Sequence, residues 1–309
     1  MIDEFQTDSW ALSIRDATSI LGASRSGYYR WKKSTKNGDE MSGVDDDVLK
    51  KKIESIIEEF VGYGYRRVTI ELKRRGTHVN HKRVLRVMRE HNLTITRKRF
   101  RPTTTDSDHD EKVYPNLLTD IEITGPNQVW AADITYIRLK EGFAYLAAIL
   151  DVGTRRCIGW CLGRDLRTRI VIDALRMAIE NRAGEDLTGL IHHSDRGVQY
   201  ASKEYTEMLE SYGIRISMSR KGNPYDNAYI ESFFKTLKCE EVHLNEYRTY
   251  NDALENIVQF IEVVYNRKRM HSALGYKSPV EFEQCVHLAI ARCTHPPTTR
   301  PHPLHSLPS

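Results

Sequence analysis

The sequence predicts a mixed α/β domain preceded by a helical region. Three β-rich runs follow one another between residues 128 and 164, and helical and β-rich runs then alternate as far as residue 219. Strands that are followed by alternating helices and strands are typical of a mixed sheet covered by helices. Before residue 101, in contrast, the apolar residues recur with helical spacing.

The composition is that of a globular protein. Of 309 residues, 40% are hydrophobic and the net charge is only +4, so the chain can bury a substantial core. No apolar run approaches the roughly 18 residues of a membrane span, and the first residues lack the layout of a secretion signal. The five cysteines form no C-x-x-C pair, which argues against a disulfide framework and a zinc site. We expect a cytoplasmic protein with reduced thiols and no membrane partner.

The first segment, residues 1–40, has a helix-turn-helix pattern. Apolar residues mark a short helix that runs into Gly22, and Ser24 is placed to cap a second helix that carries Arg30. Any helical hairpin with a glycine in its turn gives the same pattern. Two interpretations of this segment therefore remain open: it contacts DNA, with Arg30 as the contact, or it is a small packing module.

A second helical block, residues 41–105, is strongly basic. Its first helix is predicted to bury Val48, Ile53, Ile56, Ile57 and Phe60, and two more helices are predicted on either side of Gly76. Between residues 61 and 101 lie thirteen Lys or Arg and only two acidic residues. A solvated helix face normally mixes both signs of charge, so the excess favours binding to a nucleic-acid backbone. The predicted DNA contacts in this block are Arg66, Arg67, Lys82 and Arg83.

The sheet domain is predicted over residues 127–285. Residues 106–126, polar and interrupted by proline, are predicted to be a linker, and the proline-rich residues 286–309 a disordered tail. Short breaks at residues 140–142 and 153–155 predict that the first three strands form an antiparallel meander.

Three carboxylates interrupt or end the predicted elements. Asp133 lies in the run VWAADITYI, Asp195 ends LIHHSD, and Glu231 lies on the polar side of the helix in NPYDNAYIESFFKTLK. Each has an ordinary explanation: an outward-facing side chain, a turn cap, and an i,i+4 partner for Lys235. Two aspartates on neighbouring strands and a glutamate on an adjacent helix can also converge, and such a cluster needs cations. We expect a site for two Mg²⁺ or Mn²⁺ ions, which suits phosphoryl displacement.

Four stretches carry a family resemblance: WAADITYI, HHSDRGVQYAS, GNPYDNAYIESFFKTLK and YNRKRMHSALGYKSPVEF. They resemble the catalytic domain of the DDE transposases of the IS3 family of bacterial insertion sequences, which is similar to retroviral integrase. Between Asp195 and Glu231 lie 35 residues, the spacing of the DD(35)E label of this group. The resemblance covers roughly residues 125–285, and the helical blocks before it resemble the amino-terminal part of the same family's product.

The resemblance implies an RNase H-like fold in which Asp133, Asp195 and Glu231 are the catalytic metal ligands. It also implies that water nicks one strand at the element's end and that the freed 3′-hydroxyl attacks a second phosphodiester. The implied partners are double-stranded DNA, comprising terminal inverted repeats and target, further copies of the chain, and a protein or fusion segment from an upstream frame. The implied location is the bacterial cytoplasm, at the nucleoid.

Further residues of the sheet domain are candidates for contact with DNA. Lys235 and Lys238 follow Glu231 on one helical face, where they would flank a phosphate, although pairing with Glu231 is an alternative. Tyr225, on an exposed turn, could stack on a base. His193 shares the strand face of Asp195 and would either orient the metal site or be a satisfied strand histidine. Residues 267–271 are expected to contact DNA or to stabilise the core.

Two other functions fit parts of the sequence. A DNA-binding regulator would use the helical blocks and keep the sheet domain for oligomerisation, but it has no use for three converging carboxylates. A nuclease such as a ribonuclease H or a junction resolvase would use the carboxylates, but it needs no helical DNA-binding modules and joins no strands. The sequence favours the transposase over both.

Overall fold

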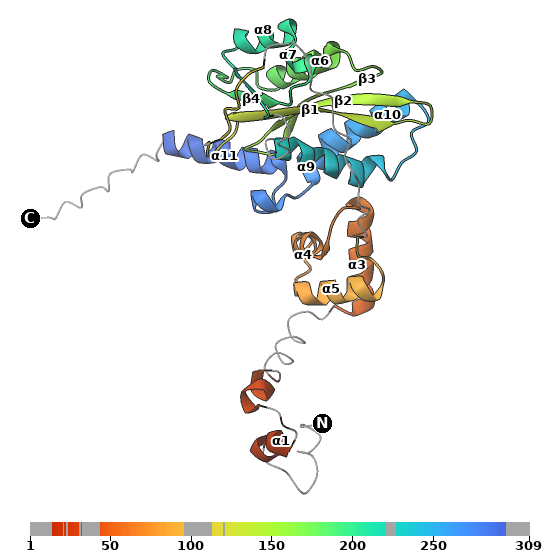
Figure 1. Cartoon of the computed structure of the whole chain (residues 1–309). Coiled ribbons are helices and arrows are strands. Elements are labelled where there is room, and N and C mark those ends of the chain that lie inside the picture. The colour runs from red at the N-terminus through yellow and green to blue at the C-terminus, as the bar shows by residue number, and fades with distance from the viewer. Residues whose placement is uncertain are drawn as a thin grey trace, which may run out of the picture. The chain divides into compact units, whose positions relative to one another are not determined.

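The computed structural model describes residues 14–20, 22, 24–30, 32, 44–95, 113–119, 121–220 and 227–294. The chain divides into two compact units, Met1–Arg97 and Lys98–Ser309, which we call the helical unit and the sheet unit (Figure 1). Within the described ranges, no helix is long and apolar enough to span a membrane.

The helical unit is made of short helices. Near its start, Gly22 has a φ of +62° between two helical stretches, and the Ser24 hydroxyl accepts a hydrogen bond from the Gly27 amide at 2.9 Å. Ser24 therefore caps the second stretch, residues 25–30, as predicted. The other helices of this unit are α1 (Ile14–Ile20), α3 (Asp46–Glu59), α4 (Tyr65–Arg74) and α5 (His81–Glu90).

One face of each of the helices α3, α4 and α5 forms the core of residues 44–95. The buried residues on these helices are Leu49, Ile53, Ile56, Val68, Leu72, Val84, Val87 and Met88. The prediction that Val48 belongs to this face is wrong, because its side chain is 47% exposed and Leu49 is buried instead. Neighbouring residues of a helix point in different directions, and Leu49 continues the spacing of Ile53 and Ile56. Gly76 lies between α4 and α5, as predicted, with a φ of +79°.

The sheet unit is built around a mixed sheet of five strands in the order β3-β2-β1-β4-β5 (Figure 1). Strands β1, β2 and β3 form the predicted antiparallel meander, whereas β4 is parallel to β1 and β5 is parallel to β4. The strands are β1 (Val129–Arg138), β2 (Phe143–Asp151), β3 (Cys157–Gly163), β4 (Ile191–Ser194) and β5 (Arg215–Met218).

Helices cover both faces of this sheet (Figure 1). One face packs against α6, α7 and α8, and the opposite face packs against α9, α10 and η4. Gly159 on β3 permits the close approach of α6, since a Cβ atom there would lie 2.2 Å from the Ala174 carbonyl oxygen. The helices are α6 (Thr168–Glu180), α7 (Val198–Ala201), α8 (Lys203–Ser211), α9 (Ala228–Leu237), η3 (Lys238–Val242), α10 (Tyr250–Val258), η4 (Gln259–Lys268), η5 (Ser272–Leu274) and α11 (Pro279–Thr294).

Part of the predicted linker is a component of the sheet unit. Residues 113–119 run beside β5, where the Leu117 amide donates to the Ser217 hydroxyl at 2.9 Å. The Met218 amide in turn donates to the Pro115 carbonyl at 3.4 Å. The prediction failed here because the polar composition of the segment does not show the strand edge that binds it.

Helix α11 extends past residue 285, where the disordered tail was predicted to begin. It starts with a capping box, in which the Glu281 amide donates to the Ser278 hydroxyl and the Ser278 amide donates to the Glu281 carboxylate. Pro279 occupies the first helical position, which suits its fixed φ. The remaining residues of the predicted tail, 295–309, lie outside the described residues.

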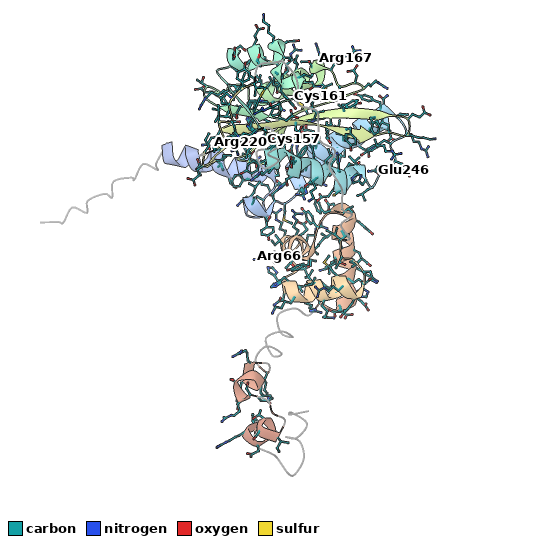
Figure 2. All side chains as sticks on the ribbon, viewed as in Figure 1. Arg66, Cys157, Cys161, Arg167, Arg220 and Glu246 are labelled. Atoms are coloured by element: carbon teal, nitrogen blue, oxygen red, sulfur yellow. The ribbon has the colours of Figure 1, made fainter. Side chains whose placement is uncertain are left out.

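Four of the five cysteines have side chains that the structure describes, and these four are free thiols. Cys157 and Cys161 lie on β3 (Figure 2), and Cys239 and Cys285 are exposed, so none of these four forms a disulfide. Burial raises the pKa of the Cys157 thiol, which keeps it protonated.

Candidate active site

The register of two strands brings Asp133 and Asp195 to one place. Strands β1 and β4 are parallel neighbours in which Ala131 pairs with His193. Asp133 lies two residues further along β1, and Asp195 lies two residues further along the chain, just after β4. Because side chains alternate between faces, both aspartates point to the face of Ala131. Neighbouring strands are about 4.8 Å apart, so the two carboxylates are close.

Glu231 approaches the same face of the sheet from α9. This helix buries Ile230, Phe233, Phe234 and Leu237 in the core that also contains Ala131. The ring of Phe233 lies 4.7 Å from the ring of Tyr265, centre to centre, which fixes the helix against η4. Glu231 lies in the first turn of α9 and is exposed. Partial burial nevertheless raises the pKa of its carboxyl, and among the described residues no ion pair between Glu231 and Lys235 opposes this increase.

The carboxyl group of Asp133 interacts electrostatically with the other charged residues of the site. Burial raises the pKa of this carboxyl well above its usual value, and the charges of Asp195 and Glu231 raise it further. The Ile134 amide, which donates to Asp133 Oδ1 at 2.8 Å, and the charge of Lys238 act in the opposite direction. The three carboxylates therefore repel one another across one small region, and a cation bound among them would relieve that repulsion.

The donor set suits a divalent cation. Carboxylate oxygens are the ligands that Mg²⁺ and Mn²⁺ prefer. Backbone amides hold one oxygen of each aspartate, since the Gly197 amide donates to Asp195 Oδ1 at 2.9 Å much as the Ile134 amide does to Asp133. Among the described residues, no three His, Cys, Asp or Glu side chains lie close enough to hold an ion as they stand.

Two polar side chains connect the surrounding elements. His193 hydrogen-bonds the Ser217 hydroxyl through Nδ1 at 2.8 Å and the Ser219 hydroxyl through Nε2 at 3.0 Å. It is thus the satisfied strand histidine of the two predicted alternatives, and it ties β4 to β5. Asn227, buried just before α9, donates from Nδ2 to the Ala132 carbonyl at 3.4 Å and so ties α9 to β1.

A buried aromatic cluster supports β4 from the opposite face. The Tyr205 hydroxyl hydrogen-bonds His192 Nε2 at 2.9 Å, and burial lowers the pKa of His192 to about 3. The Tyr200 hydroxyl is buried without a partner among the described residues, and the charges of Asp133 and Asp195 contribute to the raised pKa of this phenol. Tyr200 is therefore near the site. Its position only five residues after Asp195 could have predicted this, but Tyr200 was not among the residues predicted from the sequence.

The predicted DNA contacts of the sheet unit differ in their surroundings. Lys238 is half-buried, with Nζ 4.5 Å from the centre of the Tyr136 ring, and it acts electrostatically on Asp133. Lys235 is exposed on α9. Tyr225 lies outside the described residues. Of the two lysines, only Lys238 is part of the carboxylate region.

Residues 267–271 divide between two roles. Arg269 is buried, and its Nε and Nη2 atoms donate to the two carboxylate oxygens of Glu240, both at 2.7 Å. Since Glu240 lies in η3, directly after α9, this pair helps to position the helix that carries Glu231. Arg267 and Lys268 are exposed. Of the two predicted alternatives, Arg269 thus stabilises the core.

The predicted DNA contacts of the helical unit are also not equivalent. Arg66 on α4 is exposed (Figure 2), with its guanidinium 5.6 Å from the centre of the Tyr65 ring, and Lys82 is exposed in the first turn of α5. Arg67 is half-buried.

Arg83, in contrast, is engaged within the helical unit. It donates to Asp46 Oδ1 at 2.8 Å and to the Val44 carbonyl at 2.7 Å, which fastens α5 to the start of α3. Arg30 is exposed in its helical stretch, residues 25–30.

Comparison with known proteins assigns the chain to a family. The integrase core domain matches residues 123–224 and, in a second model, residues 212–279, and an HTH-like domain matches residues 44–101. The 31 kDa protein of insertion element IS600 from Shigella sonnei is 41% identical over 270 residues, which cover 87% of this chain and 97% of that protein. Transposase InsF for insertion sequence IS3A from Escherichia coli K12 is 36% identical over 276 residues, covering 88% and 94%. The chain belongs to the IS3 family of insertion-sequence transposases.

Membership of the IS3 family agrees with the architecture of both units. The integrase core matches and the order of the five strands confirm the predicted RNase H-like fold, and the HTH-like match falls on the basic helices. Among solved structures, the HTLV-2 integrase catalytic core domain in complex with magnesium is 17% identical, with a TM-score of 0.40, and the match covers 52% of this chain and 97% of that one.

Proposed function

We propose that the chain is a DNA transposase that nicks the ends of an insertion sequence and transfers the freed 3′-hydroxyl to a second strand. Asp133, Asp195 and Glu231 are the proposed ligands of two Mg²⁺ or Mn²⁺ ions. The observation that carries the proposal is the electrostatic interaction of three carboxylates, contributed by β1, the end of β4 and α9, within an integrase core. A relative named as the transposase of insertion sequence IS3A supports the same activity.

The residues around the carboxylates have separate tasks in this proposal. Bound ions would activate the attacking oxygen and stabilise the leaving oxygen of an in-line displacement. Lys238, half-buried beside Asp133, binds the phosphate that carries the reacting atom. Lys235, one turn nearer the start of α9, contacts the DNA backbone further out. His193, through its serine partners, keeps β4 and hence Asp195 in place.

The helical unit supplies affinity for duplex DNA. Arg66, Arg67, Lys82 and Arg30 are the proposed phosphate contacts, with Tyr225 stacking on a base of the strand in the active site. Transposition joins two element ends, so we propose a multimer of this chain as the working form, with an upstream-frame protein as a possible further component of the end complex. A DNA-binding regulator would not need the carboxylates, and a simple nuclease would not join strands.

The proposal is tested with the full chain and a labelled duplex that carries the terminal repeat of its own element. Nicking and joining are followed on denaturing gels with Mg²⁺ or Mn²⁺ and with added chelator. We expect both reactions to require the ion and to be lost in Glu231→Gln, because the amide keeps the shape of the side chain but removes its charge.

A matched control separates this loss from a general effect of removing a surface acid. Glu204 is exposed on α8, away from the carboxylate region, and Glu204→Gln should retain full activity. Persistent nicking by Glu231→Gln would contradict the assignment of the ligands. Nicking without any joining, when both ends and an upstream-frame protein are supplied, would favour the nuclease alternative.

A further inference from the structure

An exposed aromatic pair lies beside the active site and has no role in the mechanism described above. Tyr136 near the end of β1 and Phe143 at the start of β2 are 39% and 50% exposed, although large aromatic side chains usually bury most of their surface. Their rings meet edge to face with centres 5.6 Å apart. We call these two residues the aromatic shelf.

The aromatic shelf lies on β1 and β2 close to the carboxylate region. Tyr136 follows Asp133 by three residues, about 10 Å along the strand, so its side chain leaves the opposite face of the sheet from that of Asp133. Lys238 connects them, because its Nζ lies 4.5 Å from the centre of the Tyr136 ring and its charge acts on Asp133. Strand β4 ends at Ser194 and pairs only with residues 129–131 of β1, so within the described ranges no strand pairs with the stretch around Tyr136 on that side.

The charge around the shelf indicates which molecule would occupy it. Lys238 lies over one ring, and Arg138, exposed, is directly opposite Phe143 in the strand register. Aromatic faces flanked by cations match a nucleotide, whose base stacks on the rings while its phosphate meets the positive charges. A base that remains within a duplex cannot present its face to a side chain, so the nucleotide must be unstacked.

We propose that the aromatic shelf binds the unstacked base of a nucleotide adjoining the phosphate that is cleaved or joined. This inference rests on the proposed function, because it assumes that the DNA strand passes over Asp133. Stacking stabilises the locally opened end of the element and so helps to place the phosphate among the carboxylates. Loss of one stacked base weakens binding to single-stranded nucleic acid by about tenfold or more.

The test is a double-mutant cycle between the shelf and the DNA, measured by binding in chelator so that no chemistry occurs. The probe is the element-end duplex, and an abasic site replaces one base at a time on each side of the cleavage position. For the wild-type chain, removal of the base that stacks on the shelf should weaken binding about tenfold. In Tyr136→Ala and in Phe143→Ala the same abasic site should change the affinity by less than about twofold.

Two controls make the outcome specific to stacking. Tyr136→Phe keeps the ring and should keep the tenfold effect of the abasic site. Tyr212, 48% exposed at the end of α8 and outside the β1–β2 hairpin, is a matched exposed tyrosine, and Tyr212→Ala should also keep it. Unchanged thermal unfolding midpoints of the alanine variants would show that the hairpin is intact.

The possible results are distinguishable from failure of the proposed function. If every abasic site affects wild type and Tyr136→Ala equally, the shelf does not bind a base and the inference is overturned. Uniform weakening of all probes by Tyr136→Ala has the same meaning, since it reflects only a displaced Lys238. If one abasic site is coupled to the shelf but the chain never nicks DNA with Mg²⁺, the shelf binds a base and the proposed function fails.

Discussion

The arginine ion pairs of the helical unit lie at the surface, whereas the sheet unit has, besides surface pairs such as Arg169–Asp173, arginines that are paired in its interior. Arg75, Arg83 and Arg86 pair with acids of the helical unit while 26% to 49% exposed, but Arg182 and Arg269 pair while 2% and 5% exposed. An exposed pair contributes less than about 1 kcal/mol, and loss of one partner of a buried pair costs about 3 to 5 kcal/mol.

The difference separates two uses of the same side chain. A surface arginine can leave its carboxylate and bind a DNA phosphate at little cost, so ion pairs of the helical unit are compatible with binding to a nucleic acid. In the sheet unit, Arg269 cannot leave Glu240 at little cost, because a charge would then remain unpaired in a largely apolar interior. Basic residues near the active site are therefore not all available to DNA, and burial distinguishes those that are.

The largest effect is expected from removing a carboxylate of the sheet unit, which should leave the function of the helical unit intact. In Asp133→Asn, we expect nicking to fall by about a thousandfold or more, because the site loses the charge that faces Asp195 and Glu231. Binding to the duplex in chelator should stay within about threefold of wild type. A parallel loss of binding and activity would show that the two units do not divide the work in this way.

The next effect compares the two classes of arginine directly. Arg269→Ala should lower the free energy of unfolding by about 3 to 5 kcal/mol, since the Glu240 carboxylate, only 12% exposed, loses this arginine. Arg86→Ala, which removes an exposed pair with Asp46, should lower it by less than about 1 kcal/mol. Urea unfolding followed by circular dichroism measures both, and Arg267→Ala serves as the exposed neighbour that should change little. Equal losses in the two variants would remove the distinction.

Acid should act on the sheet unit through His192. Its pKa in the folded chain is lowered by burial to about 3, against an ordinary value of 6.5, so the unfolded chain takes up this proton first. The stability that depends on neutral His192 is complete above about pH 6.5 and decreases by about 1.4 kcal/mol per pH unit as the pH falls toward 3. His192→Gln, which can still accept from Tyr205, should show a smaller decrease between pH 6.5 and 4. An identical pH profile in the variant would exclude this cause.

The smallest effect concerns a single phosphate contact of the helical unit. Lys82→Ala should weaken binding to all duplexes alike and reduce the slope of affinity against salt concentration by about one. Its stability should not change, because Lys82 is exposed in the first turn of α5. Lys51, exposed on α3, is a suitable control lysine. A change in sequence preference with no change in salt slope would assign Lys82 to base contact instead.

Much of the fold and the candidate ligands could be predicted from the sequence, because these features depend on local patterns. Short breaks between β-rich runs predicted the meander, and Asp133 and Asp195 were conspicuous as acids in or after apolar runs. The partners of charged residues were not predictable. Arg83 binds Asp46 from 37 residues away, and Arg269 binds Glu240 from 29 residues away, which only the folded chain brings together.

Other failures have equally specific causes. Val48 and Leu49 are adjacent apolar residues, and which of the two is buried depends on how the helix packs in the folded chain. Tyr136 and Phe143 are ordinary strand residues in the sequence, since exposure of an aromatic side chain depends on what the rest of the chain leaves uncovered. The capping box at Ser278 was visible in the sequence as a Ser-Pro-x-Glu run and would have extended the predicted domain.

The early end of β4 has a consequence for solubility. Beyond Ala131, the side of β1 that faces β4 is no longer paired, so this part of the strand is exposed like the edge of a sheet. A second chain can add a strand to such unpaired backbone groups and aggregate. Here side chains occupy the edge: Asn227 donates to the Ala132 carbonyl, and Asp133 accepts from the Ile134 amide. A charged residue at this position also opposes edge-to-edge association. Replacement of Asp133 by valine should therefore lower the yield of soluble protein, whereas asparagine, which keeps the acceptor oxygen but not the charge, should lower it less.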